Sequence, residues 1–182
     1  GYIVAGNSNS GERDDFYQYN PINDSWTELA PFPGAPRGFA IGDTWNEKAY
    51  FGFGHDGTSL LNDLWVFDPS NMSWTELASC PCAARTHPAM IAHNGKVFVG
   101  LGNTSTENMN DWWEYDITLN TWSQKDDLPS QSRHHPYQFG INDYVYTGLG
   151  HGNDIFNDWF RYDIAAETCL LYTSDAADDS DC

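Results

Sequence analysis

Basic residues are scarce in this 182-residue chain, which holds 8 Lys and Arg against 26 Asp and Glu and has a formal net charge of −18. Binding to phosphate groups needs clustered Lys and Arg, so the composition argues against a nucleic-acid partner and against an anionic membrane surface. No apolar run approaches the roughly 18 residues that a membrane-spanning helix needs. We therefore expect neither nucleic-acid binding nor membrane insertion.

The short motifs of several enzyme classes are also missing. The chain has no Ser/His/Asp signature, no phosphate-binding glycine-rich loop and no dinucleotide fingerprint. It has six histidines but no His-x-x-x-His spacing, and His134 and His135 would point to opposite faces if both lay on one strand. The sequence therefore predicts no metal site and no cofactor, and it identifies no catalytic residue.

Aromatic residues and glycine are abundant by contrast. Aromatics make up 15% of the chain, which also holds 16 Gly and 9 Pro, and no stretch supports a long amphipathic helix. Core-forming residues mixed with turn-forming residues are typical of many short strands. The composition predicts an all-β fold.

The chain repeats itself. Four segments align: DDFYQYNPINDSWTEL from Asp14, NDLWVFDPSNMSWTEL from Asn62, NDWWEYDITLNTWSQK from Asn110 and NDWFRYDIAAETC from Asn157. Residues of three types recur every 48 positions: Trp26, Trp74 and Trp122; Arg37, Arg85 and Arg133; and Gly6, Gly54, Gly102 and Gly150. Self-similarity at a fixed period indicates a repeat architecture in which each unit is one small structural element.

Each unit reads as an Arg, an apolar strand, an aromatic-x-Gly-x-Gly segment, an aromatic strand flanked by Asp, and a Trp-x-x-Leu strand. This pattern resembles the kelch repeat, as found in the central domain of galactose oxidase and in bacterial kelch proteins, and it covers residues 1–168. The WD40 Gly-His and Trp-Asp dipeptides do not recur, and Val4 stands where the first unit should have its first glycine. The resemblance implies a β-propeller with blades of four antiparallel strands.

About four blade units are expected, with boundaries 1–29 (partial), 37–77, 85–125 and 133–168 (partial). In the second unit the strands are predicted near 38–42, 48–53, 64–68 and 74–77. The first unit should lack its opening strand and the last its outer strand. Propellers close with about four to eight blades, so we expect a partial propeller, truncated to an open arc, whose remaining blades are missing from this chain.

The end of the chain departs from the repeat. Cys169 stands where the next Trp is due, and residues 169–179 resemble a translated sequencing adapter. We therefore expect residues 169–182 to be a non-native tail outside the fold.

Variable polar residues occupy two positions that should meet at the mouth of the central channel. The position after the second glycine holds Asn7, His55, Asn103 and His151, and the position two residues past each Arg holds Phe39, His87 and His135. The kelch resemblance implies that these positions face a ligand, whereas His134 should point the other way. The predicted ligand-binding residues are His55, His87, Asn103, His135 and His151; alternatively, these histidines satisfy loop carbonyls.

Arg37, Arg85 and Arg133 are further candidates for ligand binding. The alternative is packing and hydrogen bonding between blades, because a guanidinium group makes several ordered contacts. Framework roles are also expected for glycines that allow close backbone approach (Gly52, Gly54), aromatics that fill the space between blades (Trp65, Phe67, Trp74) and aspartates that bond to turn amides (Asp63, Asp68 and their counterparts).

The leading functional hypothesis is a non-catalytic binding module that recognises a glycan or protein partner at the channel mouth. The resemblance also implies an enzyme as an alternative, a sugar mutarotase or epimerase of the sialic-acid type, although Glu12, Glu47 and Glu107 show no clear pairing. A third hypothesis is a structural segment of a larger secreted protein. The acidic, aromatic-rich composition favours an extracellular or periplasmic bacterial protein, in which Cys80 and Cys82 either pair or stay free.

Overall fold

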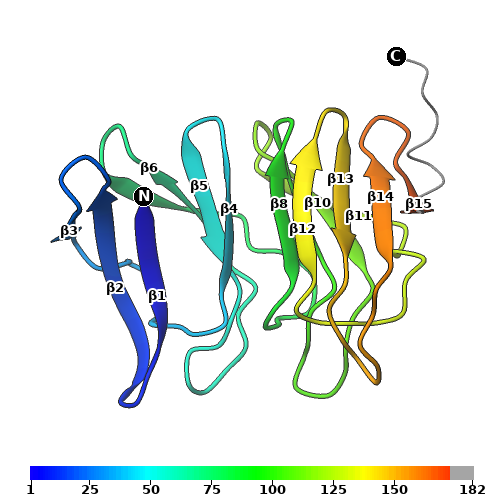
Figure 1. Cartoon of the computed structure of the whole chain (residues 1–182), viewed down its shortest axis with the longest axis horizontal. Coiled ribbons are helices and arrows are strands. Elements are labelled where there is room, and N and C mark those ends of the chain that lie inside the picture. Colours follow the sequence, from blue (N-terminus) through cyan, green and yellow to red (C-terminus); the bar gives the residue numbers. More distant parts are fainter. Residues whose placement is uncertain (173–182) are drawn as a thin grey trace.

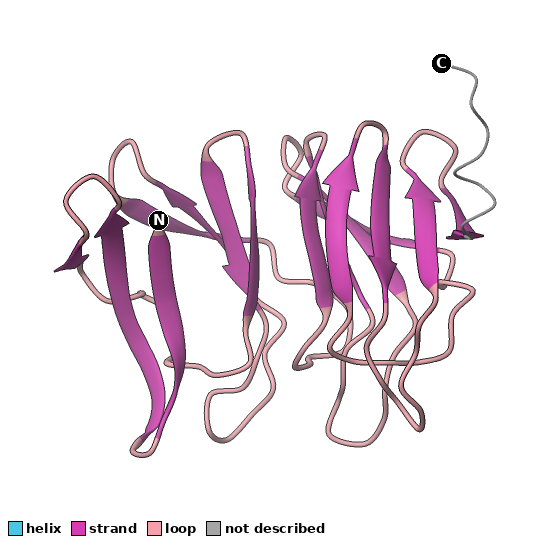
Figure 2. Cartoon of the chain, viewed as in Figure 1, coloured by secondary structure: helices cyan, strands magenta, loops and turns pink. Residues whose placement is uncertain are grey.

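The computed structural model describes residues 1–172, and every regular element in that range is a β-strand (Figure 2). The strands form four antiparallel sheets that follow one another along the chain. The first sheet holds β1 (Tyr2–Ser8), β2 (Gly11–Asn20) and β3 (Ser25–Glu28). The second holds β4 (Ile41–Trp45), β5 (Lys48–Gly52), β6 (Leu64–Asp68) and β7 (Ser73–Leu77). The third holds β8 (Ala89–His93), β9 (Lys96–Gly100), β10 (Trp112–Asp116) and β11 (Thr121–Lys125), and the fourth holds β12 (Tyr137–Ile141), β13 (Tyr144–Gly148), β14 (Trp159–Asp163) and β15 (Thr168–Tyr172).

Each sheet is a simple meander, and the sheets stand side by side from the N-terminal to the C-terminal end (Figure 1). Strand β4 packs beside β8, and β8 beside β12, so the first strands of the last three sheets line one side of the array. The first sheet has three strands and lacks the opening strand. The predicted all-β partial propeller, an open array of about four antiparallel units, is confirmed. Within residues 1–172 no helix is long and apolar enough to cross a membrane.

The sequence repeat becomes a repeat of strand register. In each of the four sheets, an aromatic residue on the strand next to the outer strand pairs with the same position of the outer strand. These pairs are Tyr19↔Trp26, Phe67↔Trp74, Tyr115↔Trp122 and Tyr162↔Cys169. Cys169 therefore takes the place of the recurrent tryptophan.

Two predicted boundaries differ from the structure. The first strand of the second unit begins at Ile41 rather than at residue 38, because Phe39 has a left-handed backbone (φ 56°) that no regular strand accommodates. The fourth unit does have an outer strand, β15, whose backbone pairs with β14 along its whole length. The expected boundary after residue 168 thus falls inside β15, and residues 173–182 of the expected tail lie outside the described residues.

Aromatic side chains fill the space between the first two sheets, as predicted. The Trp74 ring lies 5.4 Å from Phe16 on β2 and 5.0 Å from Phe32 in the segment between β3 and β4. Phe67 packs edge-on against Phe16 at 4.8 Å. The aromatic face between these two sheets is therefore buried by packing of one sheet against the other.

The third sheet shows the same dependence on both of its faces. Met90 packs into a cluster with the second sheet, whereas Ile91 packs into a cluster with the fourth. Successive side chains of a strand point to opposite faces, so β8 contributes to two interfaces at once. Burial is accordingly deepest in this central sheet, where Phe98 and Trp112 are fully enclosed.

The predicted close approach at the paired glycines is also present. A Cβ atom on Gly52 would overlap the carbonyl oxygen of Asp63, and one on Gly54 would overlap the carbonyl oxygen of Gly38. Gly54 also has a positive φ of 93°. Both glycines are therefore required by the backbone of neighbouring segments.

The aspartates divide into two groups. The carboxylate of Asp68 accepts hydrogen bonds from the Ser70 amide and hydroxyl, as predicted for a turn residue. Asp63 is different: its carboxylate accepts hydrogen bonds from Arg37 and from the Trp65 indole, so the turn-amide prediction is wrong for this position. Cys80 and Cys82 form a disulfide bond, one of the two alternatives that the sequence left open.

Candidate functional site

The two predicted mouth positions do meet at one end of the sheets. In the last three units, the residue after the second glycine forms a β-bridge with the residue that follows the recurrent arginine. These bridges are Gly38↔His55, Thr86↔Asn103 and His134↔His151. Each unit is tied to the next at the same level, because the second glycine donates a hydrogen bond to the following arginine's carbonyl. These bonds are Gly6 to Arg37 (2.8 Å), Gly54 to Arg85 (3.0 Å) and Gly102 to Arg133 (2.8 Å). The loops concerned lie along the lower edge of Figure 1.

Four aromatic rings form a continuous stack across this end, which we call the mouth stack: Phe39, His87, His135 and His151. The ring of Phe39 lies 4.8 Å from that of His87, and His87 stacks on His135 at 3.7 Å. The His151 ring is nearly parallel to that of His135 at 5.1 Å. Residues from three consecutive units thus build one surface.

The backbone holds the mouth stack in an uncommon conformation. Phe39, His87 and His135 all have left-handed φ angles, of 56°, 52° and 54°. Their amides form a ladder in which His135 donates to His87 (3.3 Å) and His87 donates to Phe39 (3.5 Å). Left-handed non-glycine residues cost of order 1–3 kcal/mol each and gather at functional sites. Because the same unfavourable φ recurs in three units, the surrounding fold must hold these residues against their own backbone preference.

His134 joins the cluster, contrary to expectation. Its ring lies 4.1 Å from His151 and 4.8 Å from His135. The prediction that His134 and His135 point to opposite faces assumed a regular strand, but β12 begins only at Tyr137 and His135 is left-handed. Sequence alternation carries no information about side-chain direction in such a segment.

Crowding suppresses protonation of these imidazoles. The pKa of His87 is lowered to about 4, first by burial and then by the neighbouring His135, His134 and His151. Burial, followed by the other histidines, also lowers the pKa of His134 and of His135. At neutral pH the rings of His87 and His135 in the mouth stack are therefore uncharged on a strongly acidic chain.

Acid should consequently destabilise the fold through His87. Its folded pKa of about 4 lies below the ordinary value of 6.5, so between these values the unfolded chain binds a proton that the folded chain does not. Discounting for the partial exposure of the ring, we expect the free energy of unfolding to fall by about 1–2 kcal/mol from about pH 7 to about pH 4.5. Urea denaturation at the two pH values measures the change. A His87→Asn variant should lose clearly less stability over the same interval, and an equal loss would show that other groups are responsible.

His55 and Asn103 are not part of the mouth stack but line a groove of their own. Both line a groove of about 640 Å³ between the loops of the second and third units, together with hydroxyl-bearing residues such as Ser59 and Thr104. His55 Nδ1 accepts a hydrogen bond from the Gly57 amide at 3.0 Å, and Asn103 donates to the Asn108 side chain at 2.8 Å. The predicted residues thus form two neighbouring groups, a ring stack and a polar groove.

The arginines lie beneath the surface. Arg37, Arg85 and Arg133 are fully buried, and each pairs with an aspartate of its own unit: Asp63, Asp111 and Asp158. Arg85 donates to both carboxylate oxygens of Asp111, at 2.5 and 2.7 Å, and also to the carbonyls of Leu101 and Ala83. Their donors are occupied within the fold, which favours the framework role over ligand binding.

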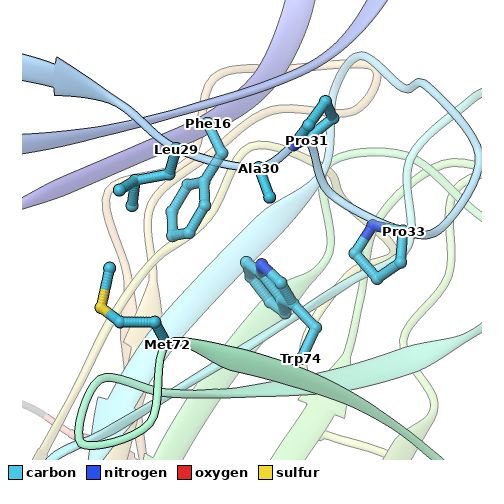
Figure 3. A pocket seen from close by; sticks show the side chains of 7 residues that line it. All are labelled: Phe16, Leu29, Ala30, Pro31, Pro33, Met72 and Trp74. Carbon is cyan, nitrogen blue, oxygen red and sulfur yellow. The ribbon is translucent and has the colours of Figure 1, made fainter.

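One apolar pocket lies elsewhere. It has a volume of about 350 Å³ and opens between the segment after β3 and the outer strand β7, with Phe16, Met72 and Trp74 among its lining residues (Figure 3). None of the predicted ligand-binding residues lines it. The pocket belongs to the aromatic interface between the first two units rather than to the mouth.

Comparison with known proteins gives one family match and one informative fold match. The family model described as the Kelch motif matches residues 54–81. No curated protein matches the chain significantly. A solved structure titled "Structure of YjhT" superposes with a TM-score of 0.71 at 18% sequence identity, and the match covers 83% of this chain and 56% of that one. The chain thus spans little more than half the length of that structure, and so low an identity supports a common fold alone.

The repeat, its constant strand register, the open array of four sheets and the matched motif all agree. The chain folds as a partial β-propeller, and residues 54–81, which run from the second unit into the segment after it, match the Kelch motif.

Proposed function

We propose that this chain is a non-catalytic binding module that recognises a glycan or protein partner at the channel mouth. The observation that carries the proposal is the mouth stack, in which Phe39, His87, His135 and His151 present adjacent rings from three units. Phe39 leaves 49% of its surface exposed, and His135 and His151 are also exposed. Flat rings at a surface suit stacking against a sugar ring or an aromatic side chain.

The neighbouring groove supplies the complementary polar groups. Ser59, Thr104 and the amide of Asn103 lie next to His55 along its wall. A few hydrogen-bonding groups beside an aromatic platform fix the orientation of a ligand that stacking alone would leave free to rotate. The loops that carry these groups are mounted on rigid sheets, which is the usual arrangement for binding sites.

The test removes two central rings of the mouth stack. A protein with His87→Asn and His135→Asn should keep the left-handed backbone, which asparagine tolerates, while losing the stacking surface. We expect its capture of glycans on an array, or of a purified protein partner, to fall about 5- to 100-fold, since each of the two lost stacking contacts is worth roughly 0.5–1.5 kcal/mol. The melting temperature should change by no more than a few degrees.

The matched control is Ile22→Ala, which alters a 94%-exposed apolar residue in the turn between β2 and β3, at the opposite end of the sheets (Figure 1). Its capture should equal that of the unmodified protein. Unchanged capture by the double variant would refute the proposal, and so would an unmodified protein that captures neither glycans nor proteins.

One contact favours the enzymatic alternative. Glu12 reaches from the first unit to His55, with 3.6 Å between its carboxylate and Nδ1. A carboxylate beside an imidazole is the kind of pair that acid–base opening of a sugar ring uses. The exchange rate of sialic-acid anomers, measured by NMR, separates the two functions: a binding module leaves the rate at its value in buffer, and a mutarotase raises it.

A further inference from the structure

We propose that His134, His135 and His151 form a binding site for a divalent transition metal ion of the zinc type. Each histidine offers one ring nitrogen, and these three atoms all lie within 4.8 Å of one another. Two of the three ligands, His135 and His151, also belong to the mouth stack, but metal binding needs only these three side chains and can be measured without any partner.

The backbone explains why the three rings converge. His134 and His151 are bridged by two backbone hydrogen bonds of 3.0 Å, so their side chains lie next to each other across a short antiparallel pair. The left-handed conformation of His135 then turns its ring back toward that pair instead of away from it. The converging geometry is therefore built into the segment before β12 and the loop after β13.

A buried polar atom supports the assignment. The Nδ1 atom of His134 is inaccessible to solvent and has no hydrogen-bond partner. An unsatisfied buried polar atom costs roughly 1–3 kcal/mol, so such atoms in native structures call for an explanation. A metal ion bound by the His134 ring would account for this nitrogen if Nδ1 is the coordinating atom, since coordination would satisfy it.

The ligand set selects the class of metal. Imidazole nitrogen suits Zn²⁺, Cu²⁺ and Ni²⁺, whereas Mg²⁺ and Ca²⁺ require oxygen ligands. Coordination uses the lone pair of a ring nitrogen, which each of the three histidines directs toward the other two. The stacked His87 holds the His135 ring in position at 3.7 Å without being a ligand itself.

Small movements complete the site. Zinc–nitrogen bonds of about 2.1 Å in a tetrahedral arrangement place the ligand atoms about 3.4 Å apart, so nitrogens that now lie within 4.8 Å of one another must approach by up to about 1.4 Å. His135 and His151 are exposed and can make this adjustment by side-chain rotation. Three protein ligands leave a fourth position open toward the solvent, as in zinc sites that bind water or a substrate.

The test is a metal titration of the full chain, freed of metal with a chelator and studied without any partner. Calorimetry with ZnCl₂ should show one ion per chain with a Kd of about 1 µM or tighter, and Co²⁺ should give the visible absorption of a tetrahedral site. A protein with His135→Asn and His151→Asn should bind zinc at least about 30-fold more weakly. The control His55→Asn, outside the three-histidine group, should stay within about 2-fold of the unmodified protein, as expected for a residue that is not a ligand.

Circular dichroism of each variant distinguishes a loss of zinc binding from a loss of folding. If the double variant is unstable, the single variant His151→Asn, in an exposed loop, gives a second measurement. A Kd above about 100 µM for the unmodified protein, far weaker than a three-histidine site should give, would overturn the proposal. So would undiminished zinc binding by the His135 and His151 variants. Partner capture in excess chelator tests the proposed binding function separately: capture that persists there supports that function even if the titration refutes the metal site.

Discussion

Replacing Arg85 by alanine is expected to lower the free energy of unfolding by about 3 kcal/mol, because it leaves the Asp111 carboxylate, whose side chain is only 13% exposed, without its counter-ion. The guanidinium group is fully buried and makes a bidentate ion pair with that carboxylate. It also donates to two backbone carbonyls, of Leu101 and Ala83, which the alanine variant would leave without these donors. Urea denaturation followed by tryptophan fluorescence measures the loss.

Two further variants show what kind of contact is lost. Arg85→Lys keeps the charge but cannot make the bidentate pair or bond both carbonyls, so its loss should be intermediate. Arg13→Ala is the matched control: this arginine is exposed on β2 and donates to Ser8 and Ser10. Exposed contacts of this kind contribute at most about 1 kcal/mol. If Arg85→Ala cost no more than Arg13→Ala, the buried pair would not stabilise the propeller.

The repeat made the arrangement of the strands predictable. Residues 48 positions apart fall in equivalent places because each unit repeats the same strand pairs, as at Phe67↔Trp74 and Tyr115↔Trp122. Periodic sequence therefore predicted both the number of sheets and the residues that pack between them. The partnership of Arg85 with Asp111 was also visible in principle, since Arg37 and Asp63 have the same separation of 26 residues. Local turn preference alone assigned Asp63 to the wrong partner.

The conformation of the mouth could not be predicted in the same way. Nothing about histidine requires a left-handed backbone, and the φ of His87 and His135 is imposed by hydrogen bonds to the neighbouring units. Alternation along a regular strand would separate His134 from His135, and only tertiary structure brings their rings to 4.8 Å. The candidate positions were identified because they recur in the repeat, whereas their mutual geometry depends on contacts between units that no single unit encodes.

Replacing Trp74 by alanine should have the second large effect, and the repeat supplies its own control. The Trp74 ring packs at 5.4 Å against Phe16 of the preceding unit and at 5.0 Å against Phe32 in the segment after β3. Because the ring is only partly buried, its truncation should cost about 2–3 kcal/mol, at or below the lower end of the range for core tryptophans. Trp26 occupies the equivalent position in the first unit, where it is 52% exposed.

Trp26→Ala should therefore cost less than about 1 kcal/mol, as for other surface substitutions, although the two tryptophans are identical in the repeat and pair with equivalent residues of their own sheets. The difference between the two variants, measured by urea denaturation, isolates the contribution of the neighbouring unit, because the contacts within the sheet are common to both. Equal losses would mean that each sheet is stabilised by its own contacts. A large loss confined to Trp74 would mean that the stability of this fold resides between its units, as expected for a repeat whose aromatic faces are buried only by stacking.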